Sequence, residues 1–131
     1  MKAVADADGL IVRSDIIDKE VMDNAPKLKV IVRAGAGYDN IDLAAATEHN
    51  ICVMNTPGQN SNAVAELALG MMIYMSRNKF TPGTGKEIKG KRLGIHAYGN
   101  VGRLVGLKGK AFGMEVITFD PYANPEVCQN D

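Results

Sequence analysis

Short, continuously apolar runs alternate along this chain with segments of helical periodicity. The apolar runs cover residues 10–13, 28–33, 51–54, 93–97 and 115–119. The helical segments between and after them cover residues 18–25, 43–48, 62–78 and 100–112. Continuous rather than alternating hydrophobicity is typical of parallel strands that are covered on both faces. Successive units of this kind predict an α/β fold with a doubly wound, parallel sheet.

The ends of these segments carry the expected local signals. Asp18 and Asp42 each precede a helical segment as N-caps. The longest segment, residues 62–78, is apolar on almost every side, so we expect its methionines to be core and the helix to lie buried between two sheets or domains. Residues 81–85 read TPGTG and form the clearest linker. We therefore expect a first domain in residues 1–60, an interdomain helix in 61–80 and a second domain in 81–131.

A strand–turn–helix–strand unit in the second domain has glycines in its turn. Residues 97–102 read AYGNVG, which is the dinucleotide pattern G-x-G-x-x-G with alanine in the first place. Glycine at such a turn lets backbone N–H groups approach a pyrophosphate, and the helix N-terminus supplies partial positive charge. Asp120 follows the last glycine by 18 positions, where a carboxylate can accept ribose hydroxyls and repel a 2′-phosphate. The unit predicts a site that prefers NAD to NADP.

Three further expectations concern the same unit. Ala97 should keep a negative φ, because its Cβ fits the turn without strain only then. The helix carries Gly102, Gly106 and Gly109, each costing about 1 kcal/mol relative to alanine, so it should pack very closely on the sheet. His96, inside the strand, is expected to be a buried, hydrogen-bonded residue rather than a catalytic one.

Composition limits the classes of partner. The 131 residues carry 15 basic and 15 acidic side chains, so bulk charge gives no argument for nucleic acid or an anionic membrane. The basic stretch 77–110 has only Phe80 and Tyr98 as aromatic residues, which are too few to stack on successive bases, and we expect it to be a solvated surface. The longest strongly apolar run, residues 67–75, is far below the roughly 20 residues of a membrane span.

The chain ends and cysteines indicate a cytoplasmic protein. No basic start followed by an apolar core opens the sequence, so no signal peptide is expected. Cys52 and Cys128 have neither a metal-ligand spacing nor nearby histidines, and they suit a reducing compartment better than a disulfide framework. We expect no metal site.

Three motifs resemble those of the NAD-dependent D-2-hydroxyacid dehydrogenases. Residues 33–42 read RAGAGYDNID, residues 55–67 contain NTPG and VAEL, and the nucleotide turn follows in the same order. The resemblance implies a flavodoxin-like substrate domain, present in part in residues 1–60, followed by the first βαβ unit of a Rossmann NAD-binding domain. It also implies an active site in the cleft between the two domains and a homo-oligomer, either dimer or tetramer.

The resemblance assigns substrate contacts to one loop and one helix start. Ala36 and Gly37 would offer backbone N–H groups to the substrate carboxylate, a role that suits a glycine-flanked loop after a parallel strand. The alternative is a tight turn that merely needs glycine. Asn60 would contact the substrate, although capping of the long helix explains an asparagine there equally well.

Phosphate recognition would fall to residues at strand ends. Arg13 and Ser14 resemble the family's contact to a phosphorylated 2-hydroxy acid, and they stand where ligands bind in α/β folds. A surface salt bridge is the alternative for Arg13. Arg33 is a weaker candidate for the same phosphate.

The resemblance also assigns the cofactor contacts. Val64 would lie against the nicotinamide ring, unless it is ordinary core. The full set of cofactor-binding candidates is Val64, Tyr98, Gly99, Asn100, Val101, Gly102 and Asp120.

No catalytic acid or base is assigned in this sequence. In the family, hydride transfer depends on an arginine, a glutamate and a histidine located after the second strand of the cofactor domain, and neither His49 nor His96 matches that histidine. The chain resembles less than half of such an enzyme. We expect its exposed strand edges and apolar faces to make it marginally stable, prone to aggregation or dependent on self-association.

Three functions remain open. The first is oxidation of a phosphorylated 2-hydroxy acid by hydride transfer to NAD. The second is a sibling activity on an unphosphorylated substrate, as in a glyoxylate or hydroxypyruvate reductase. The third is a non-catalytic NAD-binding fragment.

Overall fold

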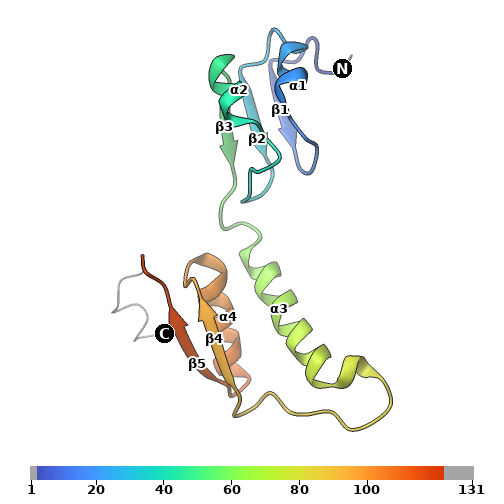
Figure 1. Cartoon of the computed structure of the whole chain (residues 1–131), viewed down its shortest axis with the longest axis vertical. Helices are drawn as coiled ribbons and strands as arrows, with labels where there is room; N and C mark the ends of the chain where they lie inside the picture. Colours follow the sequence, from blue (N-terminus) through green and yellow to red (C-terminus); the bar gives the residue numbers. More distant parts are fainter. Residues whose placement is uncertain (1–2, 123–131) are drawn as a thin grey trace. The chain divides into compact units, whose positions relative to one another are not determined.

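The computed structural model describes residues 3–122, and the chain divides into two compact units between Gln59 and Asn60. Each unit has its own sheet and its own helices (Figure 1). All strand pairings within the described residues are parallel. The predicted α/β class is therefore confirmed.

The first unit is a three-stranded sheet with two short helices. Its elements are β1 (Gly9–Val12), α1 (Lys19–Asp23), β2 (Val30–Arg33), α2 (Leu43–Glu48) and β3 (Cys52–Asn55), and the strand order is β1-β2-β3. The two expected N-caps are confirmed, because the carboxylates of Asp18 and Asp42 accept from the N–H groups of Val21 and Ala45 at 3.0 and 2.9 Å. These bonds satisfy N–H groups that a helix start leaves without partners.

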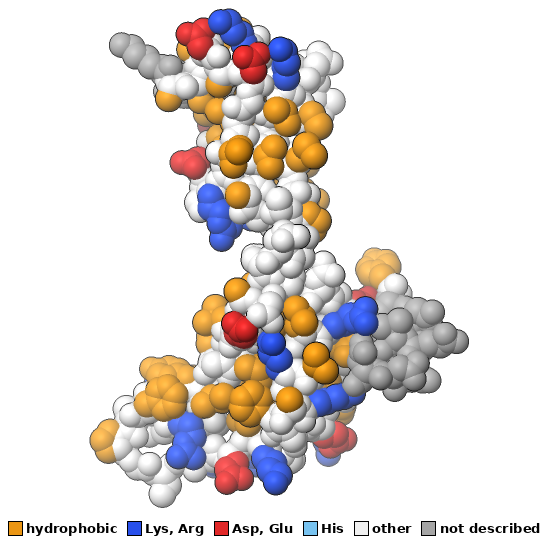
Figure 2. All heavy atoms as spheres, turned by 180° about the vertical axis from the view of Figure 1, so that it is seen from behind, with side chains coloured by type: hydrophobic (Ala, Val, Ile, Leu, Met, Phe, Trp, Pro, Cys, Tyr) orange, Lys and Arg blue, Asp and Glu red, His pale blue; other side chains and the backbone are white. Residues whose placement is uncertain are grey.

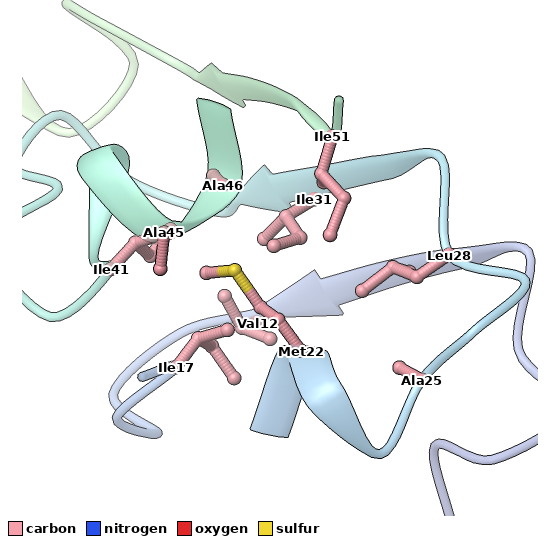
Figure 3. Packing of buried hydrophobic residues seen from close by; sticks show 10 residues of the cluster. All are labelled: Val12, Ile17, Met22, Ala25, Leu28, Ile31, Ile41, Ala45, Ala46 and Ile51. Carbon is pink, nitrogen blue, oxygen red and sulfur yellow. The ribbon is translucent and has the colours of Figure 1, made fainter. Parts of the chain in front are cut away.

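The core of the first unit lies between its helices and one face of the sheet (Figure 3). Met22 from α1 and Ile31 from β2 are its largest fully buried side chains. The opposite sheet face is open to solvent, where Ile11 is 82% exposed and Met54 54% exposed. The prediction of strands covered on both faces is thus wrong for this sheet as described, because both helices pack on the same face. Figure 2 shows hydrophobic side chains open to solvent on the molecular surface.

The second unit contains the longest helix and a two-stranded sheet. Its elements are α3 (Ser61–Ser76), the short helix η1 (Asn78–Phe80), β4 (Arg92–His96), α4 (Asn100–Ala111) and β5 (Glu115–Phe119). Helix α3 packs against α4, and the shared core contains Ala65, Leu69, Leu93 and Val105. The expected interdomain helix is therefore packed as part of the second unit.

Helix α3 is buried on one side only. Ala65 and Leu69 are buried, whereas Leu67, Met71 and Met75 are 64%, 57% and 61% exposed. The prediction that the methionine stripe is core is wrong for Met71 and Met75, whereas Met72 is partly buried and packs against the core. Helix α4 covers one side of α3, and η1 contacts α3 near its end through Phe80, whose ring meets that of Tyr74.

His96 also differs from expectation. It is exposed, and its ring lies 5.4 Å from the ring of Phe119 between centroids. Helix α4 covers the sheet face that carries Leu93 and Ile95, so side chains on the alternate positions of β4 and β5 face solvent. The expected burial of His96 is therefore wrong.

The glycines of α4 form the contact with β4. A Cβ on Gly102 would overlap the carbonyl oxygen of Ala97, and a Cβ on Gly109 would lie 2.7 Å from Cδ2 of Leu93. Gly106 lies against the Tyr98 ring, where a Cβ would approach the hydroxyl oxygen to 3.0 Å. The expectation of very close packing between this helix and the sheet is confirmed.

Ala97 occupies the left-handed region of backbone space. Its φ is 82°, so the expectation of a negative φ is wrong. The chain must turn sharply here, because the Ala97 N–H still pairs with Phe119 in the sheet while its carbonyl already lies under Gly102. A non-glycine residue in this region costs about 1–2 kcal/mol.

Two kinds of site are absent from the described residues. Between residues 3 and 122, no helix combines the length and hydropathy that crossing a membrane requires. In the same range, no three His, Cys, Asp or Glu side chains gather as potential metal ligands. Cys52 is an exposed free thiol, and Cys128 lies outside the described residues.

The first prediction concerns His49, which joins the ends of α1 and α2. Its Nδ1 lies 2.8 Å from the carbonyl oxygen of Ala45 and its Nε2 lies 2.8 Å from Oδ1 of Asp23. Both partners are acceptors, so only the doubly protonated ring donates to both. The hydrogen bond to Ala45, and then that to Asp23, raises the pKa of His49 above 6.5.

Because the folded-state pKa is raised, the stabilisation is complete below the unfolded pKa of about 6.5 and is lost as pH rises through the folded pKa. We expect the urea concentration at the unfolding midpoint of wild type to decrease as the pH is raised from about 6 to about 8. This decrease should be smaller in His49→Gln than in wild type, and it should also be smaller in Asp23→Asn. Equal pH dependence in wild type and His49→Gln would contradict the assignment.

The second prediction concerns Ala97. Replacing Ala97 with glycine removes about 1–2 kcal/mol of backbone strain and adds about 0.4–1 kcal/mol of unfolded-state entropy. We therefore expect Ala97→Gly to raise the free energy of unfolding slightly, measured by urea denaturation. Ala63→Gly, at an exposed position of α3, is the matched control and should lower the free energy of unfolding. A loss of stability in both variants would show that the turn is not strained.

Candidate functional site

Parallel pairing brings three strand ends of the first unit to one edge. Val12 pairs with Arg33, and Arg33 pairs with Asn55, so the carboxyl ends of β1, β2 and β3 lie side by side. Arg13 and Ser14 follow β1 directly and are exposed. This edge is where ligands bind in parallel α/β sheets.

Two arginines converge at this edge on Gly35. A Cβ at Gly35 would overlap Nη1 of Arg33 and would lie 2.9 Å from Nη1 of Arg13. Within residues 3–122 neither guanidinium has an ion-pair partner, so the surface salt bridge considered for Arg13 is not formed there. The Nε of Arg33 is buried and has no hydrogen-bond partner in the described chain. Two adjacent positive charges without a carboxylate make this edge a candidate site for an anion.

The sequence ranks Arg33 below Arg13, and in the structure both guanidinium groups lie beside Gly35. Arg33 is the last residue of β2 and is half-buried, whereas Arg13 lies just beyond β1. The signal that could have joined them is the register between two neighbouring parallel strands, which a single sequence does not fix.

Three hydrogen bonds join the loop after β2 to β1 and to the end of β3. The Ala34 N–H donates to Val12 at 2.8 Å, the carbonyl of Gly35 accepts from the Thr56 N–H at 2.9 Å, and the carbonyl of Ala36 accepts from Nδ2 of Asn55 at 2.8 Å. The carbonyls are thus engaged. In the described part of the chain the N–H groups of Ala36 and Gly37 have no hydrogen-bond partner.

This polarity is what an anion-binding loop needs, because its free donors are backbone N–H groups. Asn55 fixes the loop and was not among the predicted site residues. It ends β3 inside the NTPG motif, which was the available signal.

Asn60 and Val64 lie at the start of α3. Asn60 occupies the N-cap position, but its side chain makes no capping hydrogen bond. Val64 is 41% exposed and so is not an ordinary core residue. The structural alternatives weighed for both residues are therefore not realised here. Their contacts to substrate and cofactor stay predictions.

The turn of the second unit leaves the start of α4 open. Gly99 is the N-cap with φ −83° and ψ −153°, and a Cβ there would have no atom within 4 Å. The first hydrogen bond of the helix runs from the Arg103 N–H to Gly99 at 3.0 Å. A helix start leaves the N–H groups before that bond without helical partners, and here these belong to Asn100, Val101 and Gly102. Such a start, with room beside the N-cap, suits a diphosphate.

Tyr98 supports the turn from inside. Its side chain is 3% exposed and lies against Gly106. Its N–H donates to Oδ2 of Asp120 at 2.7 Å, so a cofactor contact by Tyr98 does not use this donor. Oδ1 of Asp120 accepts from the Tyr122 N–H at 2.8 Å. The carboxylate predicted to bind ribose thus lies beside the phosphate turn.

A cavity of about 380 Å³ runs along β4 to this turn. Its lining residues are Met72, Leu93, Gly94, Ile95, His96, Ala97, Val101, Gly102 and Val105. His96 is the only ionisable residue in this lining. The cavity reaches the helix start through Val101 and Gly102, and the rest of its lining is mostly apolar.

Comparison with known proteins agrees with the motifs. Residues 1–130 match the family described as D-isomer specific 2-hydroxyacid dehydrogenase, catalytic domain. A D-3-phosphoglycerate dehydrogenase from Methanocaldococcus jannaschii is 42% identical over 147 residues, covering 99% of this chain and 28% of the relative. The human protein of the same name is 42% identical over 139 residues, covering 93% and 26%. The chain thus spans about a quarter of the length of these relatives.

Solved structures give the same family. The NAD⁺-bound 3-phosphoglycerate dehydrogenase of Entamoeba histolytica is 51% identical with a TM-score of 0.90, over 95% of this chain and 41% of that one. An NAD-dependent formate dehydrogenase from Staphylococcus aureus, in complex with NAD, is 31% identical with a TM-score of 0.80, over 92% and 42%. The resemblance drawn from the motifs is confirmed, and the chain belongs to the D-isomer-specific 2-hydroxyacid dehydrogenases.

Proposed function

We propose that this chain carries substrate- and cofactor-binding parts of an NAD-dependent D-3-phosphoglycerate dehydrogenase. Such an enzyme oxidises the 2-hydroxyl of 3-phosphoglycerate to give 3-phosphohydroxypyruvate, in the phosphorylated route to serine. The observation that supports this substrate is the convergence of Arg13 and Arg33 on Gly35 without an acidic partner in the described residues. The names of the relatives support the same substrate.

The substrate has an anion at each end, and the first unit offers two kinds of anion-binding group. Guanidinium groups bind phosphate through paired N–H donors, so the phosphate is assigned to Arg13 and Arg33, with the Ser14 hydroxyl beside them. The free N–H groups of Ala36 and Gly37 are assigned to the carboxylate. Asn60 is assigned a contact to the substrate from the start of α3.

The second unit is assigned to NAD, and its residues fit that group. The open start of α4 at Gly99, Asn100, Val101 and Gly102 would hold the diphosphate. Asp120 would accept the adenosine ribose hydroxyls and oppose a 2′-phosphate. Val64 is assigned to the nicotinamide ring, and bound NAD supplies the hydride acceptor.

Two other functions compete with this proposal. Another D-2-hydroxyacid dehydrogenase, such as a glyoxylate or hydroxypyruvate reductase, would need no phosphate site, and the paired arginines argue against it. A non-catalytic NAD-binding fragment would bind both ligands without turnover. No proton-transferring residue is assigned in this chain, so turnover and binding are measured separately.

The third prediction tests the substrate. By calorimetry or NMR titration of the whole chain, wild type should bind 3-phosphoglycerate at least about 10-fold more tightly than glycerate, because a charged hydrogen bond contributes about 1.5–3 kcal/mol. Arg13→Ala and Arg33→Ala should each weaken the binding of 3-phosphoglycerate about 10-fold or more and leave the binding of glycerate nearly unchanged.

Lys27→Ala is the control, because Lys27 is an exposed cation of the same unit whose partner is Asp6. It should change neither ligand. Wild type that binds both acids equally would favour the unphosphorylated sibling. Binding of both 3-phosphoglycerate and NAD with no NADH formed would favour the non-catalytic fragment.

We also propose that the chain is a cytoplasmic homo-oligomer that associates through the outer face of α3. This face carries the exposed side chains Leu67, Met71 and Met75, and no charged residue occurs between positions 67 and 76. At its end, the rings of Tyr74 and Phe80 meet edge to face at 5.3 Å. An uncharged apolar face offers nothing for a charged partner to recognise, and it is complementary to a second copy of itself. An exposed thiol such as Cys52 persists in the reducing cytoplasm.

The fourth prediction tests this face. The double variant Leu67→Glu with Met71→Glu should shift the sedimentation of the chain toward the monomer, because it places charges in the apolar contact. Leu107→Glu, at a 64% exposed position of α4, is the control and should keep the wild-type state. Far-UV circular dichroism checks that the helices remain. Wild type that sediments as a monomer at every concentration would refute the proposal.

A further inference from the structure

Asp120 connects two segments that are distant in the sequence. Its Oδ2 accepts from the N–H of Tyr98, 22 positions earlier, at 2.7 Å, and its Oδ1 accepts from the N–H of Tyr122 at 2.8 Å. The end of β5 is thereby tied to the turn that follows β4. A hydrogen bond to a carboxylate is about twice as strong as one between neutral groups.

The turn needs such a tie. Tyr98 is buried, so its N–H would be unsatisfied if no acceptor reached it. Ala97, immediately before it, has a φ of 82°, which alanine adopts only when the surroundings hold it there. The sheet bond from the Ala97 N–H to Phe119 and the contact of its carbonyl with Gly102 fix one side of the turn. Asp120 fixes the other side.

We propose that Asp120 is a positioning residue that sets the conformation of the phosphate-binding turn, in addition to its ribose contact. The inference rests on the proposed NAD site. By holding the Tyr98 N–H inward, the carboxylate leaves Gly99 and the free N–H groups of α4 directed at the diphosphate. Each carboxylate oxygen has two acceptor positions, so ribose hydroxyls can donate to Asp120 while the turn bonds persist.

The two roles of Asp120 predict opposite signs for a ligand that has a diphosphate and no ribose. If Asp120 only binds ribose, removing its negative charge reduces repulsion of inorganic pyrophosphate, which should bind equally or more tightly. If Asp120 positions the turn, removing the acceptor releases the Tyr98 N–H and should weaken the binding of pyrophosphate.

The fifth prediction uses inorganic pyrophosphate as the probe, titrated into the whole chain by calorimetry or ³¹P NMR. Asp120→Ala should weaken the binding of pyrophosphate about 5- to 10-fold, because the charge-assisted hydrogen bond to Tyr98 is lost and part of the turn relaxes. Asp120→Asn keeps one oxygen that can accept from Tyr98, although it loses the charge and the acceptor for Tyr122, so it should bind pyrophosphate more tightly than Asp120→Ala.

Glu115→Ala is the control, because it removes an exposed negative charge at the start of the same strand, paired with Arg92. It should not weaken pyrophosphate. Equal or tighter binding by both Asp120 variants would overturn the positioning role.

A second readout does not depend on ligand. In the amide spectrum the Tyr98 N–H of wild type should be shifted downfield and protected from exchange. It should lose both features in Asp120→Ala and keep protection in Asp120→Asn. Unchanged Tyr98 protection in Asp120→Ala would overturn the inference. If wild type bound neither NAD nor pyrophosphate, the proposed cofactor site would be overturned instead.

Discussion

The parallel pairing of neighbouring strands is the constraint on which both candidate sites depend. Because paired parallel strands end at the same edge, residues distant in sequence meet there without any long-range side-chain contact to guide them. In the first unit, the pairing of Val12 with Arg33 sets two guanidinium groups beside Gly35. In the second, the pairing of His96 with Phe119 sets the glycine turn beside Asp120. One backbone rule thus produces an arginine pair in one unit and a carboxylate-braced turn in the other.

The glycines of α4 and the strained Ala97 are two aspects of the same geometry. Gly102 lets the helix start so close to β4 that the carbonyl of Ala97 occupies the position of a side chain. The chain has to reverse within the residues before α4, and the reversal places Ala97 at positive φ. The helix has low intrinsic propensity at Gly102, Gly106 and Gly109, and the close packing on Leu93 and Tyr98 offsets that cost. The open start of α4 therefore depends on tertiary packing rather than on helix propensity.

Local features of this fold could be read from the sequence, and features that need a tertiary neighbour could not. The caps at Asp18 and Asp42 depend on residues three positions apart, so sequence pattern predicts them correctly. The burial of α3 depends on what covers its outer face, which the pattern of Leu67, Met71 and Met75 does not reveal. For the same reason, the sequence placed His96 in the core although its side of the sheet is open. The backbone state of Ala97 follows from contacts with Phe119 and Gly102, which no local pattern encodes.

The zero net charge of the chain is compatible with two anion sites, because recognition depends on local arrangement and not on the total. Arg13 and Arg33 are available to the proposed anion because the described structure gives them no carboxylate, while lysines elsewhere in the unit pair with Asp6, Asp8 and Glu48. At the turn, the attraction comes from backbone N–H groups, which add no formal charge. Asp120 carries a negative charge close to this point, and its two backbone donors compensate part of it. In the proposed cofactor site, a carboxylate can therefore lie beside the diphosphate without opposing its binding, provided that its oxygens remain bonded to the turn.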